Sequence, residues 1–271
     1  MSKIDGIYKD VVLLQGDCLE LMKGIPDGSI NLVVTSPPYA LQRKNQYGGV
    51  NEADYPNWTV EYMRTLRPKL SEGASVFINI RPHLKNGVIS DYTLKTRLAL
   101  REDGWYENEE LIWIKPDSPP LGSTKRPRRS WESIHWFSMS KQPYCDTKAN
   151  GVESDRIGFE NGKHEHGGLS HIHAGQNKSK KGISRSRDYI EVGTGKVEKN
   201  ISHPAMFPVQ VPEHLIKMCS EGGGTVLDMF MGSGTTGVAC KNLNRKFIGM
   251  ELDEIYFNIA KERIENHEVT E

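Results

Sequence analysis

Long apolar runs, paired cysteines and a net charge are all missing from this sequence of 271 residues. No apolar run approaches the roughly 20 residues of a membrane-spanning helix, so we predict no membrane partner. The first ten residues, MSKIDGIYKD, lack the apolar core and cleavage site of a secretory signal. The four cysteines form no Cys-x-x-Cys pair, which argues against a disulfide scaffold or a cysteine zinc site and favours a reducing cytoplasm: Cys18, Cys145, Cys219 and Cys240.

The absence of net charge hides an uneven distribution. The chain has 35 Lys and Arg residues against 35 Asp and Glu residues. Between positions 117 and 200 there are 15 basic and 10 acidic residues, which leaves 20 basic and 25 acidic residues elsewhere. A positive middle on a negative body predicts a local surface for a polyanion, with an ordinary solvated loop as the alternative.

What is present is an alternation of strand and helix signals. Strand patterns at 10–16, 29–36 and 74–80 are each followed by a helical pattern, at 17–25, 57–70 and 90–102. Alternating strands at 105–116 and 131–140 indicate an antiparallel hairpin at the sheet edge. The C-terminal part shows the same alternation, with helices at 211–220, 234–244 and 253–267 and strands at 224–230 and 245–252. This pattern predicts an α/β fold with a mostly parallel sheet.

A long segment interrupts this pattern. From 149 to 200 the chain is rich in Gly, Ser, Lys and His and poor in large apolar residues, so it cannot close a core of its own. We expect one domain in two halves, 1–140 and 201–271, separated by a loop-rich insert at 141–200. The four histidines of this insert fit a surface loop better than a metal site, and we predict no metal: His164, His166, His171 and His173.

A glycine motif follows the penultimate strand. Gly232, Gly234 and Gly237 have G-x-G-x-x-G spacing between a strand and a helix, and Glu251 ends the next strand 19 residues after Gly232. Such a loop admits a ligand close to the backbone, and the acid accepts ribose hydroxyls, which fits an NAD enzyme and an S-adenosylmethionine enzyme equally. Only about 20 residues follow Glu251, so the missing strands must precede the insert and the sheet must be circularly permuted. The loop after the 29–36 strand then joins the glycine loop at one sheet edge.

That earlier loop carries Ser36, Pro37, Pro38 and Tyr39. The prolines cannot continue a strand and stiffen the bend. The Ser36 hydroxyl and the Pro37 carbonyl can accept from an exocyclic amine of a base and turn its lone pair toward a methyl donor. Tyr39 offers a face on which an extruded base can stack. A rigid strand end without chemistry is the alternative.

Together, TSPPY (35–39) and DMFMGSGTTG (228–237) resemble the catalytic motif and cofactor loop of amino-methylating DNA methyltransferases. Their order resembles the permuted beta group. The resemblance implies a circularly permuted Rossmann-like methyltransferase fold, S-adenosyl-L-methionine as cofactor, and double-stranded DNA as partner. HPAMFPVQVPEHLI (203–216) resembles the segment that closes over the methionine end, with Phe207 where many relatives have Lys.

Ser36 favours N4-cytosine as the methylated group, because relatives with Ser at this position mostly modify cytosine. The alternatives are N6-adenine methylation, an NAD-dependent oxidoreductase, and a DNA-binding protein with a relic site. The resemblance leaves open a cognate restriction endonuclease and a monomer or a homodimer. It implies a cytoplasmic location in a prokaryotic or phage-infected cell, associated with the nucleoid through DNA.

The expected site has three parts. The catalytic residues are Ser36, Pro37, Pro38 and Tyr39. The expected cofactor-binding residues are Asp17, Cys18, Thr35, Phe207, Pro208, Asp228, Phe230, Gly232, Ser233, Gly234, Thr235 and Glu251; a helix cap is the alternative role of Asp17. The expected DNA-binding residues are Lys125, Arg126, Arg128, Arg129, Lys180, Lys181, Arg185 and Arg187. We also expect the loop NQYGGV (45–50) to order when DNA binds.

Overall fold

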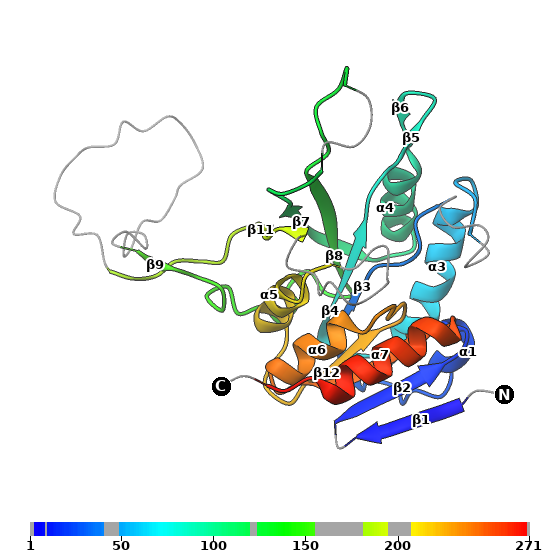
Figure 1. Ribbon diagram of the computed structural model, residues 1–271, viewed down its shortest axis with the longest axis vertical. Coiled ribbons are helices and arrows are strands. Elements are labelled where there is room, and N and C mark those ends of the chain that lie inside the picture. The colour runs from blue at the N-terminus through cyan, green and yellow to red at the C-terminus, as the bar shows by residue number, and fades with distance from the viewer. Residues whose placement is uncertain are drawn as a thin grey trace.

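The computed structural model describes residues 3–8 (as backbone), 10–40, 49–119, 124–154, 181–194 and 207–269. Nine strands of this part form one sheet: β1 (Lys3–Tyr8), β2 (Val11–Gln15), β3 (Ile30–Thr35), β4 (Leu70–Ile80), β7 (Tyr106–Ile114), β8 (Trp131–Ser138), β11 (Tyr189–Glu191), β12 (Thr225–Asp228) and β13 (Lys246–Glu251). Their order in space is β1-β2-β13-β12-β3-β4-β8-β7-β11 (Figure 1).

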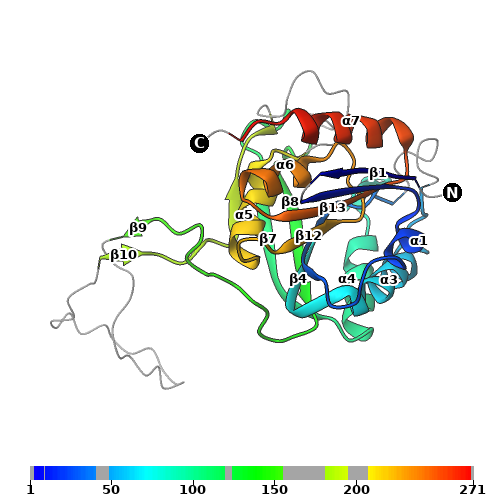
Figure 2. The same cartoon turned by 90° about the horizontal axis from the view of Figure 1, so that it is seen from below.

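Helices cover both faces of the sheet. The helices are α1 (Cys18–Met22), α3 (Tyr55–Leu66), the short 3-10 turn η1 (Arg67–Lys69), α4 (Tyr92–Glu102), α5 (Gln210–Cys219), α6 (Thr235–Asn242) and α7 (Glu254–Asn266). Helices α1, α3 and α4 lie on one face, and α5, α6 and α7 lie on the other (Figure 2). Alternate residues of a strand point to opposite faces, so Leu32 and Phe77 join the core under α5–α7 while Val33 and Val76 join the core under α1 and α3.

The strand directions decide where a ligand can bind. Strands β2, β13, β12, β3 and β4 are parallel neighbours, so their carboxyl ends meet at one edge of the sheet. Strands β12 and β13 come from the C-terminal part of the chain but lie between β2 and β3. The circular permutation predicted from the motif order is therefore confirmed, as is the mostly parallel sheet.

The antiparallel hairpin is also present. Strand β8 pairs antiparallel with both β4 and β7, which reverses direction at that side of the sheet. Outside it lies β11, a parallel neighbour of β7 that comes from the segment expected to be a loop-rich insert. Ile190 and Val192 are buried there, and the Trp113 indole donates to the Val192 carbonyl at 2.9 Å. Residues 190 and 192 of that segment thus belong to the core.

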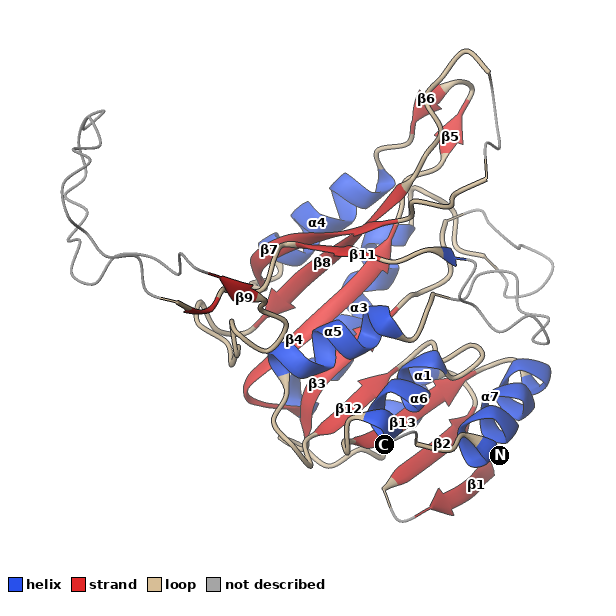
Figure 3. Cartoon of the chain, turned by 60° about the vertical axis from the view of Figure 1, so that its left-hand side comes forward, coloured by secondary structure: helices blue, strands red, loops and turns tan. Residues whose placement is uncertain are grey.

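The other additions to the expected pattern are short. Strand β1 pairs antiparallel with β2 through an irregular register. Two small hairpins, β5 (Leu84–Lys85) with β6 (Val88–Ile89) and β9 (Glu153–Ser154) with β10 (Gly182–Ile183), project from the body (Figure 3). Among the helices of the described ranges, none is long and apolar enough to cross a membrane.

Candidate active site

A cavity of about 890 Å³ opens at the carboxyl edge of the sheet. Its walls come from the loops after β2, β3, β4, β12 and β13, together with the start of β8 and the end of β7. All four residues of the Ser36–Tyr39 motif line this cavity, and so do Gly232, Ser233 and Thr235 of the glycine loop. The structure therefore brings the two motifs together, although Thr35 and Asp228 beside them are 193 positions apart in the sequence.

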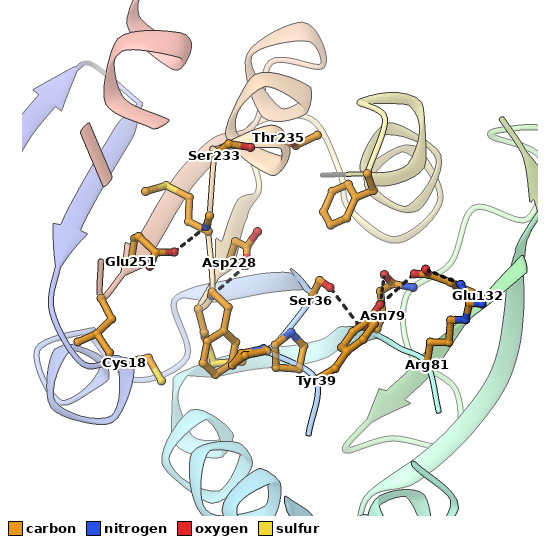
Figure 4. Close-up of a pocket in the computed structure, with 18 of the residues that line it drawn as sticks. Cys18, Ser36, Tyr39, Asn79, Arg81, Glu132, Asp228, Ser233, Thr235 and Glu251 are labelled. Atoms are coloured by element: carbon orange, nitrogen blue, oxygen red, sulfur yellow. Dashed lines mark hydrogen bonds and ion pairs between the residues drawn. The ribbon is translucent and has the colours of Figure 1, made fainter. Parts of the chain in front are cut away.

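Glu251 fixes the glycine loop from below. The Gly232 amide donates to its Oε2 at 2.8 Å, and the Asp253 amide donates to its Oε1 at 2.9 Å (Figure 4). Burial raises the pKa of Glu251, and the two amide donors oppose that shift. Gly232 and Gly234 have φ values of 53° and 80°, a left-handed backbone that glycine adopts without strain. One carboxylate and two glycines thus fix the conformation of this loop.

Asp228 organises the same loop from inside the sheet. Its Oδ1 accepts from the Thr35 hydroxyl at 2.8 Å and from the Phe230 amide at 3.1 Å, and its Oδ2 accepts from the Thr236 hydroxyl at 2.7 Å. Burial raises the pKa of this carboxyl to about 6, against the effect of the three donors. Thr35 itself is buried and does not line the cavity, so it supports the site through Asp228.

The expected adenosine side of the cavity is partly apolar. Asp17 lines it while its Oδ1 caps α1 by accepting from the Leu19 amide at 2.8 Å, so the cap is present and the second oxygen is not used by it. Burial, with the charge of Asp17, raises the pKa of the Cys18 thiol to about 12, which keeps it neutral. The Phe230 ring lies 5.6 Å from the Trp58 ring. These residues make an apolar wall with one carboxylate at its rim.

The remaining expected cofactor residues divide into two groups. Phe207 lines the cavity, at the start of the segment that precedes α5. Pro208 and Gly234 do not line it. A Cβ on Gly234 would lie 3.0 Å from the Ala260 Cβ, so this glycine lets the loop approach α7. Gly234 therefore acts on the site through packing.

The Ser36–Tyr39 motif is held by strand β4. The Ser36 hydroxyl donates to the Asn79 carbonyl at 3.3 Å, which leaves its lone pairs as acceptors. The Tyr39 hydroxyl donates to Glu132 Oε2 at 2.9 Å and lies 3.4 Å from Asn79 Oδ1 (Figure 4). Burial, followed by the charge of Glu132, raises the pKa of Tyr39 well above its ordinary value. The ring is fixed at its hydroxyl end.

The structure adds polar residues that the sequence reasoning missed. Asn79, Arg81, Lys115 and Glu132 line the cavity beside Tyr39. Lys115 pairs with Glu132 Oε1, and Arg81 Nη1 lies 3.6 Å from the same oxygen. One signal was available, because Lys115 is a charge directly after the apolar end of β7 (residues 111–114), at the edge where ligands bind. Glu132 gave no such signal, since its strand begins at that edge only because it runs antiparallel.

The expected DNA-binding residues lie at several places. Arg129 lines the cavity, while Arg128 donates to the carbonyls of Ser118 and Pro116 at 3.1 and 3.2 Å. Arg126 donates to the Gly87 carbonyl. The other residues of this group that the structure describes are exposed: Lys125, Lys181, Arg185 and Arg187. Lys180 lies outside the described residues, as do the four insert histidines and most of the 45–50 loop, of which Gly49 and Val50 line the cavity. Within the described ranges, no group of three or more His, Cys, Asp or Glu side chains could hold a metal ion.

Comparison with known proteins finds DNA methyltransferases by family profile, by sequence and by structure. The profile of the DNA methylase family N6_N4_Mtase matches residues 30–262. The Type II methyltransferase M.PvuII of Proteus hauseri is 30% identical over 285 residues, covering 94% of this chain and 84% of the relative. The Type II methyltransferase M.SmaI of Serratia marcescens is 29% identical over 286 residues, covering 93% and 90%.

Solved structures share the fold. The structure titled PvuII DNA methyltransferase (cytosine-N4-specific) matches with a TM-score of 0.76 at 23% identity, over 99% of this chain and 92% of that one. A complex of M1.HpyAVI with SAM matches with a TM-score of 0.64 at 21% identity, over 94% of this chain and 98% of that one.

Proposed function

Because the chain belongs to the N6/N4 DNA methylase family, whose methyl donor is S-adenosylmethionine, we propose that it methylates the N4 amine of cytosine in a short duplex DNA sequence. The observation that carries this proposal is the Ser36 hydroxyl, which lines the cavity shared with the glycine loop and keeps its lone pairs for an amine. The relative whose structure is titled cytosine-N4-specific supports the same base.

The residues of the cavity fit S-adenosylmethionine. When bound, this donor supplies a methyl group on a positively charged sulfur. The amides of Ser233 and Thr235 would hold its carboxylate, because the Gly232 and Gly234 amides already donate to Glu251 and to the Met231 carbonyl. Glu251 would accept from the ribose hydroxyls, since each of its oxygens has a lone pair beyond the one given to a backbone donor. Asp17 would accept from the adenine amine, and Phe230 would pack on the adenosine.

On the other side of the cavity, residues of the Ser36–Tyr39 motif would make the amine of the base more nucleophilic. The lone pair of an exocyclic amine is delocalised into the base, so it is a poor nucleophile. The Ser36 hydroxyl and the Pro37 carbonyl accept from its two hydrogens and turn the lone pair out of the ring plane. The prolines hold both acceptors in place, so positioning supplies much of the rate. The base stacks on Tyr39, whose hydroxyl is anchored to Glu132.

N6-adenine methylation is the second candidate, because the family includes both activities and the same acceptors could serve an adenine amine. The further proposals concern the surroundings of the site. We infer that 141–200 supplies part of the DNA-reading surface, together with Lys125, Arg126, Arg128 and Arg129. A restriction endonuclease partner, the choice between monomer and homodimer, and a cytoplasmic location stay predictions.

Mass spectrometry of nucleosides from DNA treated with the protein and S-adenosylmethionine tests the base. We expect N4-methylcytosine, and N6-methyladenine as the only product would reject the proposal. Ser36→Ala should lower the rate constant about 100-fold or more while binding of S-adenosylhomocysteine and DNA persists. Ser29→Ala is the matched control, because Ser29 precedes β3 as Ser36 follows it and its hydroxyl bonds only the Pro26 carbonyl at the far end. Full activity of Ser36→Ala would remove the acceptor role.

A further inference from the structure

Lys115 is a charged side chain in a buried place. The residue is 8% exposed and lies directly after β7, where it lines the cavity. Its ammonium pairs with Glu132 Oε1 and lies 4.0 Å from the centre of the Trp113 ring. Lysine is seldom buried, and burial of a cation without compensation is costly. An ammonium has three donors, and among the described residues its hydrogen-bonding acceptor is Glu132 alone. Two N–H groups of Lys115 can therefore donate to a ligand inside the cavity.

Glu132 connects this cation to the ring on which the base would stack. Its Oε2 accepts from the Tyr39 hydroxyl at 2.9 Å, while its Oε1 faces Lys115 and, at 3.6 Å, Arg81. Glu132 thus holds Lys115 and Tyr39 in fixed positions relative to each other. In Figure 4, Ser36 lies between Glu251 on one side and the cluster of Tyr39, Asn79 and Glu132 on the other.

The hydrogen-bonding edge of the base shows which acceptors the two remaining N–H groups of Lys115 could bond. In cytosine, the N4 amine is followed by two acceptors, N3 and the O2 carbonyl. In adenine, the N6 amine is followed by one acceptor, N1, and then by a C–H. An extruded base leaves water and its Watson–Crick partner, so each unmet acceptor costs free energy. One N–H of Asn79 is already engaged, because Nδ2 donates to the Ser133 carbonyl at 3.0 Å.

We propose that Lys115 donates to the N3 and O2 edge of the extruded cytosine, and that Glu132 holds Lys115 and Tyr39 in register for it. This inference rests on the proposed function, since it assumes a cytosine in the cavity. It makes Lys115 a residue that determines the choice of base, separate from Ser36 and Pro37, which activate the amine. A site built to bond a polar edge rejects a base that lacks it more strongly than an apolar slot could.

The test begins with the unaltered protein. Once the methylated site has been mapped, duplexes are made with cytosine, 3-deazacytosine or 2-thiocytosine at the target position. The first analogue lacks the N3 acceptor, and the second has a weak acceptor in place of O2. We expect kcat/KM to fall about 10- to 100-fold for at least one analogue, the range for a hydrogen bond from a charged donor.

The variant Lys115→Met then separates recognition from other effects. Its kcat/KM on cytosine should fall by a similar factor, while its loss on the sensitive analogue should shrink to a few-fold, since that bond is already gone. Lys95→Met is the control, because Lys95 is an exposed lysine of α4 that bonds Asp91. Binding of S-adenosylhomocysteine should be the same in all three proteins.

The outcomes are separable. If the unaltered protein yields only N6-methyladenine, the proposed function fails and this inference fails with it. If it yields N4-methylcytosine but treats both analogues as it treats cytosine, the inference alone is overturned, whether or not Lys115→Met folds. An equal loss by Lys115→Met on cytosine and on both analogues would also overturn it, because that is what a structural ion pair predicts.

Discussion

At the scale of single residues, Asp228 is a buried carboxyl whose hydrogen-bond donors, among the residues that the structure describes, are all neutral. It is 2% exposed, and its donors are two hydroxyls and one amide. Burial raises its pKa to about 6 from an ordinary value of 3.8. Between these two values the folded chain keeps a proton that the unfolded chain has lost, so this group makes the fold less stable as the pH rises from about 4 to about 6.

Asp228→Asn removes that titration. Relative to the unaltered protein, the variant should gain about 3 kcal/mol in its free energy of unfolding between pH 4 and pH 7, most of it below pH 6. Urea unfolding of both proteins at several pH values measures the difference, in which the titration of all other groups cancels. Asp91→Asn, at the exposed start of α4, is the control for losing a carboxylate. A difference that does not change with pH would contradict the assignment.

Glu251 makes a second prediction at this scale. Its two oxygens each accept a backbone amide, from Gly232 and from Asp253. In Glu251→Gln one of these amides would face an NH₂ group, so the glycine loop has to shift. Calorimetry should show that binding of S-adenosylhomocysteine weakens about 10- to 100-fold. Glu254→Gln, an exposed neighbour in α7, should bind normally. Equal affinity of both variants would mean that the loop does not depend on this carboxylate.

At the scale of elements, Gly237 sets the distance between α6 and its neighbours. A Cβ there would lie 2.4 Å from Ile264 Cδ1 and 2.8 Å from the Phe247 ring. Alanine in a helix gains about 1 kcal/mol over glycine. Overpacking against a ring that the core holds rigid costs about 1–3 kcal/mol, so the clash wins.

Gly237→Ala should therefore unfold at lower urea concentration, with a net loss of up to about 2 kcal/mol in stability. Gly222→Ala is the control, because nothing lies within 4 Å of its added Cβ. Adding Ile264→Val removes the Cδ1 atom, which makes the shortest of these contacts, and should recover part of the loss. A raised midpoint for Gly237→Ala would show that α6 moves away at no cost.

The elements also show what the sequence could reveal. The long periodic segments, such as α3 and β4, were predicted because their apolar spacing repeats several times. Strand β11 was not, because its three residues are too few to establish an alternation. Its place is decided by pairing with β7, about 80 positions earlier. Such long-range pairing leaves no local signal.

At the scale of the whole molecule, long-range strand pairing again separates the part of the site that the sequence predicts from the part that it does not. The half made of Ser36–Tyr39, Gly232 and Glu251 was predictable, since the loops after parallel strands must share an edge. Glu132 was not, because its place depends on where the antiparallel strand β8 begins, whereas Lys115 follows β7 directly and carried a signal that was missed. The permutation followed from the order of the catalytic motif and the glycine loop along the chain, which no single segment reveals.

The distribution of charge is the other property of the whole chain, and it predicts how binding responds to salt. The excess of basic residues between 117 and 200 includes Lys125 and Arg126, which lie before β8 on the side of the sheet where the cavity opens. Each phosphate that a basic residue neutralises adds about 0.9 to the slope of log affinity against log salt concentration. Replacing both with Gln should lower that slope by about 2 and weaken binding to all duplexes alike.

Fluorescence anisotropy with a labelled duplex at several salt concentrations measures this slope. Lys217 and Lys246 provide the control, because they are exposed and lie at the opposite edge of the sheet, in the last turn of α5 before β12 and at the first position of β13. Replacing these two with Gln changes the net charge equally, so an effect of net charge alone would appear in both double variants. If the slopes of the two variants are the same, the positive middle segment does not face the DNA backbone. If the slope falls only for the variant at Lys125 and Arg126, these two residues contact the DNA backbone beside the cavity. That is the position expected, since a duplex must lie across the carboxyl edge for a base to reach Ser36.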